Sequence, residues 1–302
     1  MLFQLFRNVY HFFRKLFLGT GISTVPPFSW LKQWAVASMR GARRAPVLGS
    51  WMRLDPGDRL NLAVNGVYEP EDTEFVRRVV KPGDVAFDIG ANIGYYTLFL
   101  SRLVGPSGRV VAFEPAPDLL EILRGNVAYN RCAHVTVEPK AVTDRTGPLV
   151  LYMEAGRPED NRIFAADDSA RSEVRIEGVA LDEAPAVAGL SPSFIKMDIQ
   201  GAEMQALRGM VGLLRASPRV CVLLEFWPYG IIKAGHEPLD LVDALNAAGL
   251  EVRRVMPDLR LTAVDRARLV EECGIGIGLY INLVAAHPER MRELEREFNT
   301  TA

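Results

Sequence analysis

The chain has 302 residues, of which 49% are apolar and 24% are charged, and its net charge at pH 7 is −2. This composition excludes a disordered or fibrous protein and suits one large α/β domain with appendages, or two small domains. The three cysteines are Cys132, Cys221 and Cys273. Their odd number and wide spacing give no disulfide framework or zinc site, so we expect buried thiols and a reducing cytoplasm.

The first 54 residues carry a charge pattern of their own. Eight of the 35 basic residues and none of the 37 acidic residues lie before Asp55, so the remainder has a net charge of −10. We therefore predict a basic extension at 1–54 and a domain at 55–302. Between residues 2 and 17, ten apolar or aromatic side chains recur close to a helical period, with Arg7, Arg14 and Lys15 among them.

Two interpretations of this amphipathic segment stay open. A basic, aromatic-rich helix can lie in the headgroup region of an anionic membrane, or it can dock on the domain or on a second subunit. The interspersed charges and Pro26-Pro27 exclude a spanning helix, and Arg14 and Lys15 are foreign to a secretory signal. The expected location is the cytoplasm, with possible peripheral contact at the inner face of the membrane through residues 1–17.

The segment 85–104 predicts a strand, a tight turn and a helix. An apolar, β-favouring run ends in Asp88, two glycines follow at Gly90 and Gly94, and Tyr95 opens a stretch with helical length and composition. Ligands of open α/β sheets bind outside the carboxyl ends of the strands, where a glycine turn lets the backbone approach them. The first candidate binding site is therefore this turn.

The residues of the turn indicate which ligand it holds. A dinucleotide fingerprint requires a glycine in the middle, where this chain has Asn92, and Asp88 would repel a pyrophosphate. S-adenosylmethionine carries a sulfonium, an ammonium and ribose hydroxyls but no phosphate, so it suits an acid at this position. A second strand, 109–113, ends in Glu114, at the spacing where an α/β nucleotide site places its acceptor for ribose hydroxyls.

The middle of the chain predicts a third strand over 135–142, followed by a β insertion. Residues 149–153 and 174–181 alternate as strands, and the polar segment between them includes Asp160-Asn161-Arg162. We expect a hairpin over the ligand end of the sheet, because loops on a rigid scaffold often select the acceptor.

The last chemical segment begins with a buried strand at 193–197. Asp198 follows it, and Glu203 lies at the start of the next helix, which is expected to run to about Leu214. A further strand, 220–224, ends in Glu225, with Trp227 and Tyr229 close behind; polar groups beside aromatic rings are typical of a sugar site, although such rings are also common in cores. Strands at the end of the chain, including a late strand at 276–286, are predicted to complete the sheet with an antiparallel edge, before a final charged helix.

Three blocks of this sequence resemble the signature blocks of the FkbM-type methyltransferases. They are Asp88-Ile89-Gly90-Ala91-Asn92-Ile93-Gly94-Tyr95-Tyr96-Thr97, Phe113-Glu114-Pro115 and Lys196-Met197-Asp198-Ile199-Gln200-Gly201-Ala202-Glu203. The resemblance covers roughly residues 66–228 and implies a Rossmann-like class I methyltransferase fold: a mostly parallel seven-stranded sheet with helices on both faces and a small β insertion. It also implies S-adenosylmethionine as cofactor and, for many members, O-methylation of sugars or natural products.

The resemblance extends to individual site residues. It implies donor contacts at Asp88, Gly90, Asn92, Gly94, Tyr95 and Glu114, at Asp144 beside the adenine, and at Glu69 of the Tyr-Glu-Pro segment near the methionine end. On local chemistry alone, Asp144 equally begins a turn and Glu69 equally precedes a helix.

For catalysis, methyl transfer needs positioning and a base for the hydroxyl proton. Asp198 is the first candidate for that base, with Glu203 and Glu225 as further catalytic candidates and Trp227 and Tyr229 as acceptor contacts. Mg²⁺ on the three acids is conceivable by ligand type, but a metal-free site is expected.

Alternative functions are an NAD(P)-linked oxidoreductase, a non-catalytic binder of S-adenosylmethionine and a nucleic-acid methyltransferase. Asn92 argues against the first, and the acidic body argues against nucleic acid, which needs a basic surface. The expected partner is a small hydroxylated molecule, a glycan or a glycolipid.

Overall fold

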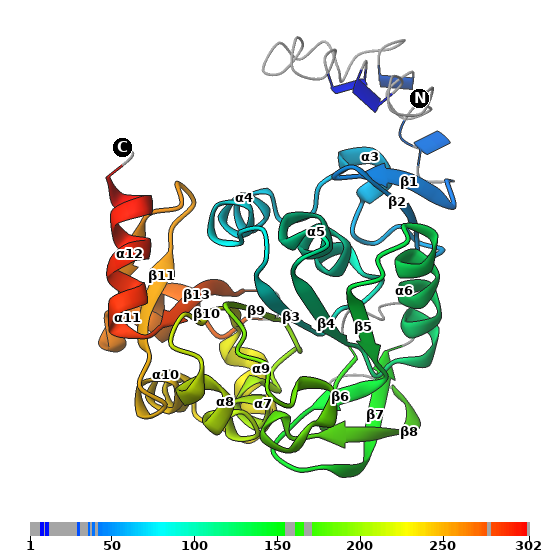
Figure 1. Cartoon of the computed structure of the whole chain (residues 1–302). Coiled ribbons are helices and arrows are strands. Elements are labelled where there is room, and N and C mark those ends of the chain that lie inside the picture. The colour runs from blue at the N-terminus through cyan, green and yellow to red at the C-terminus, as the bar shows by residue number, and fades with distance from the viewer. Residues whose placement is uncertain are drawn as a thin grey trace.

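The computed structural model describes residues 7–8, 10–11, 29–30, 36, 38–39, 42–154, 161–165, 171–276 and 279–300. Its centre is an eight-stranded sheet with the order β12-β11-β13-β10-β9-β3-β4-β5 (Figure 1). The strands are β3 (Val85–Ile89), β4 (Arg109–Phe113), β5 (Val135–Glu138), β9 (Phe194–Met197), β10 (Cys221–Phe226), β11 (Glu251–Val255), β12 (Leu261–Ala263) and β13 (Ile281–Ala286).

Five neighbouring strands, from β5 to β10, run parallel, and β13 pairs antiparallel with both β10 and β11. This confirms the predicted Rossmann-like α/β sheet, although it has eight strands where seven were expected. The last three strands, β11, β12 and β13, complete the sheet with an antiparallel edge, as predicted. Within that edge β13 has neighbours on both sides, which suits its sequence, because Leu283 to Ala286 are apolar and fully buried.

Helices cover both faces of the sheet (Figure 1). One face carries α4 (Pro70–Val79), α5 (Tyr95–Val104), α6 (Pro117–Tyr129) and α12 (Pro288–Asn299). The other carries α7 (Glu203–Arg208), α8 (Val211–Ala216), α9 (Pro228–Lys233), α10 (Pro238–Ala247) and α11 (Arg266–Cys273). The helix expected from Glu203 to about Leu214 is thus divided into α7 and α8. The break lies at Gly209, which has no room for a Cβ because that atom would lie 1.9 Å from the Thr143 carbonyl oxygen.

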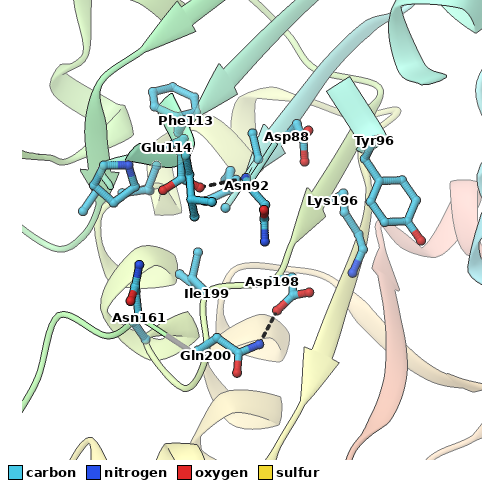
Figure 2. A pocket seen from close by; sticks show the side chains of 18 of the residues that line it. Asp88, Asn92, Tyr96, Phe113, Glu114, Asn161, Lys196, Asp198, Ile199 and Gln200 are labelled. Carbon is cyan, nitrogen blue, oxygen red and sulfur yellow. Dashed lines mark hydrogen bonds between the residues drawn. The ribbon is translucent and has the colours of Figure 1, made fainter. Parts of the chain in front are cut away.

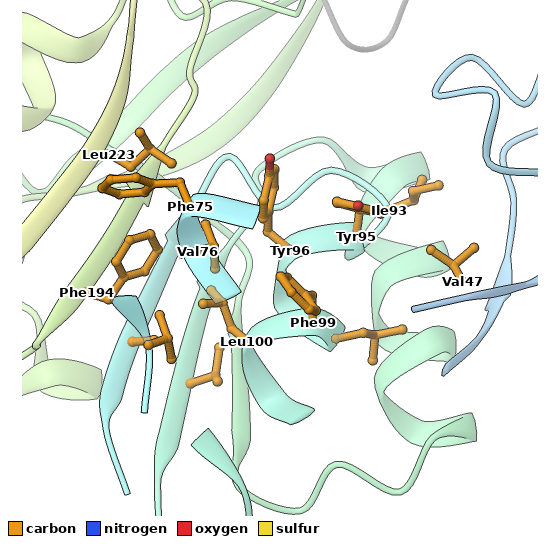
Figure 3. Packing of buried hydrophobic residues seen from close by; sticks show 14 of the residues in the cluster. Val47, Phe75, Val76, Ile93, Tyr95, Tyr96, Phe99, Leu100, Phe194 and Leu223 are labelled. Atoms are coloured by element: carbon orange, nitrogen blue, oxygen red, sulfur yellow. The ribbon is translucent and has the colours of Figure 1, made fainter. Parts of the chain in front are cut away.

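The first face has an aromatic and aliphatic core that leads directly to the ligand end of the sheet. Phe75 and Val76 of α4 pack over Phe194 of β9 and Leu223 of β10 (Figure 3). The Phe75 ring also stacks on Phe298 of α12, with 4.8 Å between the ring centroids. Burial of this stripe fixes α4 against the sheet, and α4 therefore delivers its first turn to the carboxyl ends of the strands.

The predicted β insertion is present as a small three-stranded sheet with the order β6-β8-β7. Strands β7 (Gly147–Glu154) and β8 (Arg171–Val179) form the antiparallel hairpin, and β6 (Lys140–Val142) runs parallel to β8. The single strand expected over 135–142 is therefore two strands in different sheets. Pro139 separates them, and it has no N–H to continue the β5 ladder.

Residues before the glycine turn add a hairpin of β1 (Arg44–Val47) and β2 (Ser50–Arg53), and a short helix, α3 (Leu62–Asn65). Although the hairpin belongs to the segment with basic charge, it packs on the domain. Asn126 of α6 accepts from the Arg53 N–H at 2.6 Å and donates to the Arg53 carbonyl at 3.0 Å.

Most of the predicted amphipathic helix at 2–17 lies outside the described residues. Within the part that is described, Arg7 donates to the Leu62 carbonyl at 3.3 Å and His11 Nε2 lies 2.7 Å from the Val64 carbonyl, so these two side chains contact α3. None of the described helices is long and apolar enough to cross a bilayer. Membrane contact through 1–17 stays a prediction.

Candidate active site

A cavity of about 280 Å³ opens at the carboxyl ends of β3, β4, β9 and β10, where the sequence predicted a ligand (Figure 2). Polar side chains from all four strand ends line it: Asp88, Asn92, Glu114, Lys196, Asp198, Gln200 and Glu225. The insertion contributes Leu151, Asn161 and Ile163 to the same cavity. The described part of the predicted acceptor loop therefore reaches the site.

The glycine turn brings β3 and β9 into close contact. Gly90 has a φ of +86°, and a Cβ at this position would lie 2.0 Å from the carbonyl oxygen of Asp198. The Asp198 N–H also donates to the Ile89 carbonyl at 3.1 Å. A glycine is needed here because any side chain would push the two strand ends apart.

Gly90→Ala is expected to destabilise the protein by more than about 2 kcal/mol, because the added Cβ is strained by its φ and collides with a backbone oxygen. Chemical denaturation measures the change. The control is Gly125→Ala in α6, where a Cβ meets nothing within 4 Å and helix propensity predicts a gain of about 0.5–1 kcal/mol. A Gly90→Ala variant as stable as the wild type would contradict the close approach.

Asn92 and Glu114 form one unit. Asn92 has a φ of +50°, a conformation that Asn tolerates better than most residues, and its N–H donates to Glu114 Oε2 at 2.7 Å. The other oxygen of Glu114 accepts the Ala116 N–H at 2.9 Å. The amide that a dinucleotide site would offer to a pyrophosphate is therefore committed to a carboxylate.

Asp88 and Glu114 are both buried, and burial raises the pKa of Asp88 to about 6 and that of Glu114 to about 7. Hydrogen bonds oppose this shift in each case: Thr97 Oγ1 donates to Asp88 Oδ2 at 2.5 Å, and two backbone N–H groups donate to Glu114. A ligand that brings positive charge and hydroxyl donors would favour the ionised form of both acids.

Strand register places the remaining polar groups in a row. Met197 pairs with Ile89 and with Leu224, and Glu225 pairs with Asn282, so Asp198 lies level with Gly90, Glu225 and Asn282 across four strands. Because side chains alternate along a strand, Asp88, Lys196 and Asp198 lie on the same face of the sheet, the face that α4 and α5 cover.

Helix α4 adds two more acids to this face. Asp72 is 3% exposed and accepts both hydrogen bonds from the Asn282 amide, at 2.9 and 2.8 Å. Glu69 accepts from the hydroxyl of Tyr96 at 3.0 Å. Burial and the neighbouring carboxylates raise the pKa of Asp72 to about 7. Sequence reasoning missed Asp72, Asn282 and the cavity-lining Tyr280, because no local pattern connects residues about 210 positions apart.

Five of the predicted site residues do not line the cavity: Glu69, Gly94, Asp144, Glu203 and Tyr229. Gly94 caps α5 and Asp144 is exposed, since the chain leaves the main sheet at Pro139 before reaching it. Tyr229 packs on Trp227, with 5.5 Å between the ring centroids. Glu69 borders a neighbouring hollow and reaches the main cavity through Tyr96.

Glu203 closes the turn between β9 and α7. Its Oε1 accepts the N–H groups of Ile199 at 3.2 Å and Gly201 at 3.3 Å, while its Oε2 is buried without a partner in the described structure. Burial raises the pKa of this carboxyl to about 7. Glu203 therefore positions the loop that carries Asp198, and its carboxylate is turned to the backbone.

Glu203→Gln is expected to stabilise the protein at pH 8 but not at pH 4. The folded-state pKa of about 7 exceeds the unfolded value of about 4.3, so the stability that Glu203 contributes is full below pH 4 and lost as the pH rises through 7. The neutral amide avoids this loss, on the order of 2 kcal/mol. Melting temperatures of the variant and the wild type between pH 4 and 8 should diverge; parallel curves would contradict a buried, protonated Glu203.

Trp227 is 5% exposed and lines the cavity, but its indole N–H has no acceptor among the described residues. A buried N–H donor without a partner is costly, so a ligand oxygen that accepts from it would be favourable. In the described parts of the chain, no three His, Cys, Asp or Glu side chains are grouped so that they could hold a metal ion.

Comparison with known proteins gives the family. The model of the methyltransferase FkbM domain matches residues 88–252, more than half of the chain. The chain is 40% identical over 97 residues to the 31-O-demethyl-FK506 methyltransferase FkbM of Streptomyces tacrolimicus, a match that covers 32% of this chain and 35% of that protein. It is 25% identical to the hexuronic acid methyltransferase AglP of Haloferax volcanii, over 55% of this chain and 63% of that protein.

Solved structures of methyltransferases also match the chain, at low sequence identity. A putative rRNA methylase from Clostridium thermocellum matches 72% of this chain and 93% of its own, with a TM-score of 0.45 and 12% sequence identity. This likeness concerns the fold, and the family follows from the match over 88–252. The glycine turn and the strand-end acids of the cavity lie within that match, and the chain belongs to the FkbM family of S-adenosylmethionine-dependent methyltransferases.

Proposed function

We propose that this protein transfers the methyl group of S-adenosylmethionine to a hydroxyl oxygen of a sugar, a glycolipid or a hydroxylated natural product. The observation that carries the proposal is the position of Asp198. Its carboxylate lines the cavity at the end of β9, next to the Gly90 turn and level with Glu225. An acid there can take the proton of an acceptor hydroxyl beside the methyl group.

The proposed reaction is an in-line displacement at the methyl carbon. The acceptor oxygen forms a bond to this carbon as the carbon–sulfur bond breaks, S-adenosylhomocysteine leaves, and the hydroxyl proton moves to Asp198. Gln200 holds the base, since its Nε2 donates to Asp198 Oδ1 at 2.9 Å. The opposite oxygen of Asp198 is left to face the acceptor.

The residues proposed to bind the methyl donor include the acids at the ends of β3 and β4. Asp88 is assigned to the positively charged methionine end and Glu114 to the ribose hydroxyls, with Asn92, Gly90 and Tyr95 shaping the wall between them. Ala141 and Val142 line the part of the cavity beyond Glu114, where the adenine ring would lie, in place of Asp144. These assignments rest on position in the cavity and on the charge of the donor.

The proposed class of acceptor is inferred from the residues that line the side of the cavity near β10. Glu225 and the unpaired indole N–H of Trp227 offer an acceptor and a donor to hydroxyl groups, and the rings of Trp227 and Tyr280 offer flat apolar faces. The names of FkbM and AglP, which concern a natural product and a hexuronic acid, agree with a hydroxylated acceptor. The net charge of −10 beyond residue 54 disfavours nucleic acid as a substrate.

A screen with labelled S-adenosylmethionine tests the proposal. Nucleotide sugars, glycolipids and small polyols are each incubated with the full chain, with Asp198→Asn as the inactive control and with EDTA in a parallel arm. Label in a hydroxylated product, absent with the variant and unchanged by EDTA, supports a metal-free O-methyltransferase. Label that appears only in RNA or protein would overturn the acceptor class, and loss with EDTA would overturn the metal-free site.

A further inference from the structure

Lys196 is a buried cation without an ionic partner. Its side chain is 2% exposed and lines the cavity, yet among the described residues its ammonium makes no ion pair within 4.0 Å and no hydrogen bond. Its ammonium also lies over the Tyr96 ring, whose centroid is 5.3 Å from Nζ. Figure 2 shows Lys196 beside Asp198, both facing the cavity.

The surroundings keep Lys196 charged. Burial alone would lower its pKa, but the charges of Glu69, Asp198, Asp72 and Glu225 outweigh burial and raise it. Lys196 is therefore an ammonium at neutral pH and cannot serve as a base. Among the described residues the ammonium forms no ion pair with these carboxylates, and because Lys196 lines the cavity it can pair with an anionic group of a bound ligand.

The glycine turn cannot bind that anionic group. Each backbone N–H from Gly90 to Gly94 is already donated: two to the Phe113 carbonyl, one to Glu114, one to the Asn92 side chain and one to the Ala91 carbonyl. Lys140, the other lysine that lines the cavity, belongs to β6 on the far side of β4, away from β9.

The methyl donor carries three charges at its methionine end: a sulfonium, an ammonium and a carboxylate. The cavity supplies opposite charges side by side, because Asp88, assigned above to the positively charged end, pairs in register with Lys196 on the neighbouring strand, which is left for the anion. We propose that the Lys196 ammonium binds the α-carboxylate of the donor and so holds the methionine end in register with Asp198. This inference concerns the donor and is independent of the acceptor proposed above.

Binding of two product analogues tests the inference without an acceptor. Isothermal titration compares S-adenosylhomocysteine with its decarboxylated form, which keeps the ammonium and loses the carboxylate. The wild type should bind S-adenosylhomocysteine about 10- to 100-fold more tightly than the decarboxylated form. Lys196→Met should lose that factor for S-adenosylhomocysteine and bind the decarboxylated form equally well or better, and Lys196→Arg should keep most of the preference.

Lys140→Met is the matched control, since it removes the other cavity lysine and should change the affinities for both ligands by the same factor. Equal affinity of the wild type for the two ligands would overturn the proposal, even if Lys196→Met fails to fold. So would a Lys196→Met variant that binds S-adenosylhomocysteine like the wild type or weakens both ligands equally. Failure of the acceptor screen would leave these titrations unaffected, so the two proposals fail separately.

Discussion

Asp198→Asn is expected to lower kcat for methyl transfer by about 10²- to 10⁴-fold, while the dissociation constant of S-adenosylhomocysteine changes by less than about threefold. The reason is that the acceptor and the donor are proposed to occupy different parts of the cavity. Asp198 lies at the end of β9, on the acceptor side of the Gly90 turn, whereas the acids assigned to the donor end β3 and β4. The amide keeps the size of the side chain and a partner for Gln200, but it cannot take a proton.

Kinetics with the first acceptor found in the screen, together with titration of the product, measure both quantities. Asp243→Asn is the control, because this exposed acid of α10 pairs with Arg266 and lies outside the cavity. If Asp198→Asn weakens donor binding as severely as is expected below for Asp88→Ala, Asp198 belongs to the donor site and another residue must act as the base.

Asp88→Ala is expected to raise the dissociation constant of S-adenosylhomocysteine at least about 100-fold. Asp88 is 2% exposed and faces the cavity, so its carboxylate can interact with the donor ammonium at low local polarity. Asp88→Asn tests the charge alone, since it keeps an acceptor for the Thr97 hydroxyl, which donates to Asp88 at 2.5 Å. Melting temperatures establish that both variants are folded.

The same titrations carry a pH dependence. Burial raises the pKa of Asp88 to about 6 and that of Glu114 to about 7, and a cationic ligand prefers the ionised acids. Affinity in the wild type should therefore rise as the pH increases from about 5.5 to 8, with release of protons on binding. Asp88→Asn should flatten the lower part of this rise. A wild-type affinity independent of pH would show that the two acids do not face the donor.

Sequence reasoning reached the fold and the centre of the site because their signals are local. The glycine turn comes directly after the buried strand Val85–Ile89. Glu114 comes directly after β4 and Asp198 directly after β9, and the carboxyl ends of parallel strands meet at one edge of the sheet. The position of Asp144 was harder to predict. It depends on the course of the chain after Pro139, where the chain leaves the main sheet and enters the insertion.

The composition and order of its residues determined that this chain forms a doubly wound sheet with a cavity at the Gly90 turn, since strand periodicity, glycine turns and strand-end acids act over a few residues. Only the tertiary structure decided that Glu203 faces the backbone and that Asp72 meets Asn282 from the other end of the chain. It also decided that Lys196 lies among carboxylates without forming an ion pair to any described residue. Those outcomes depend on how α4 packs across the sheet on Phe194 and Leu223, and long-range packing of this kind leaves no periodic trace in the sequence.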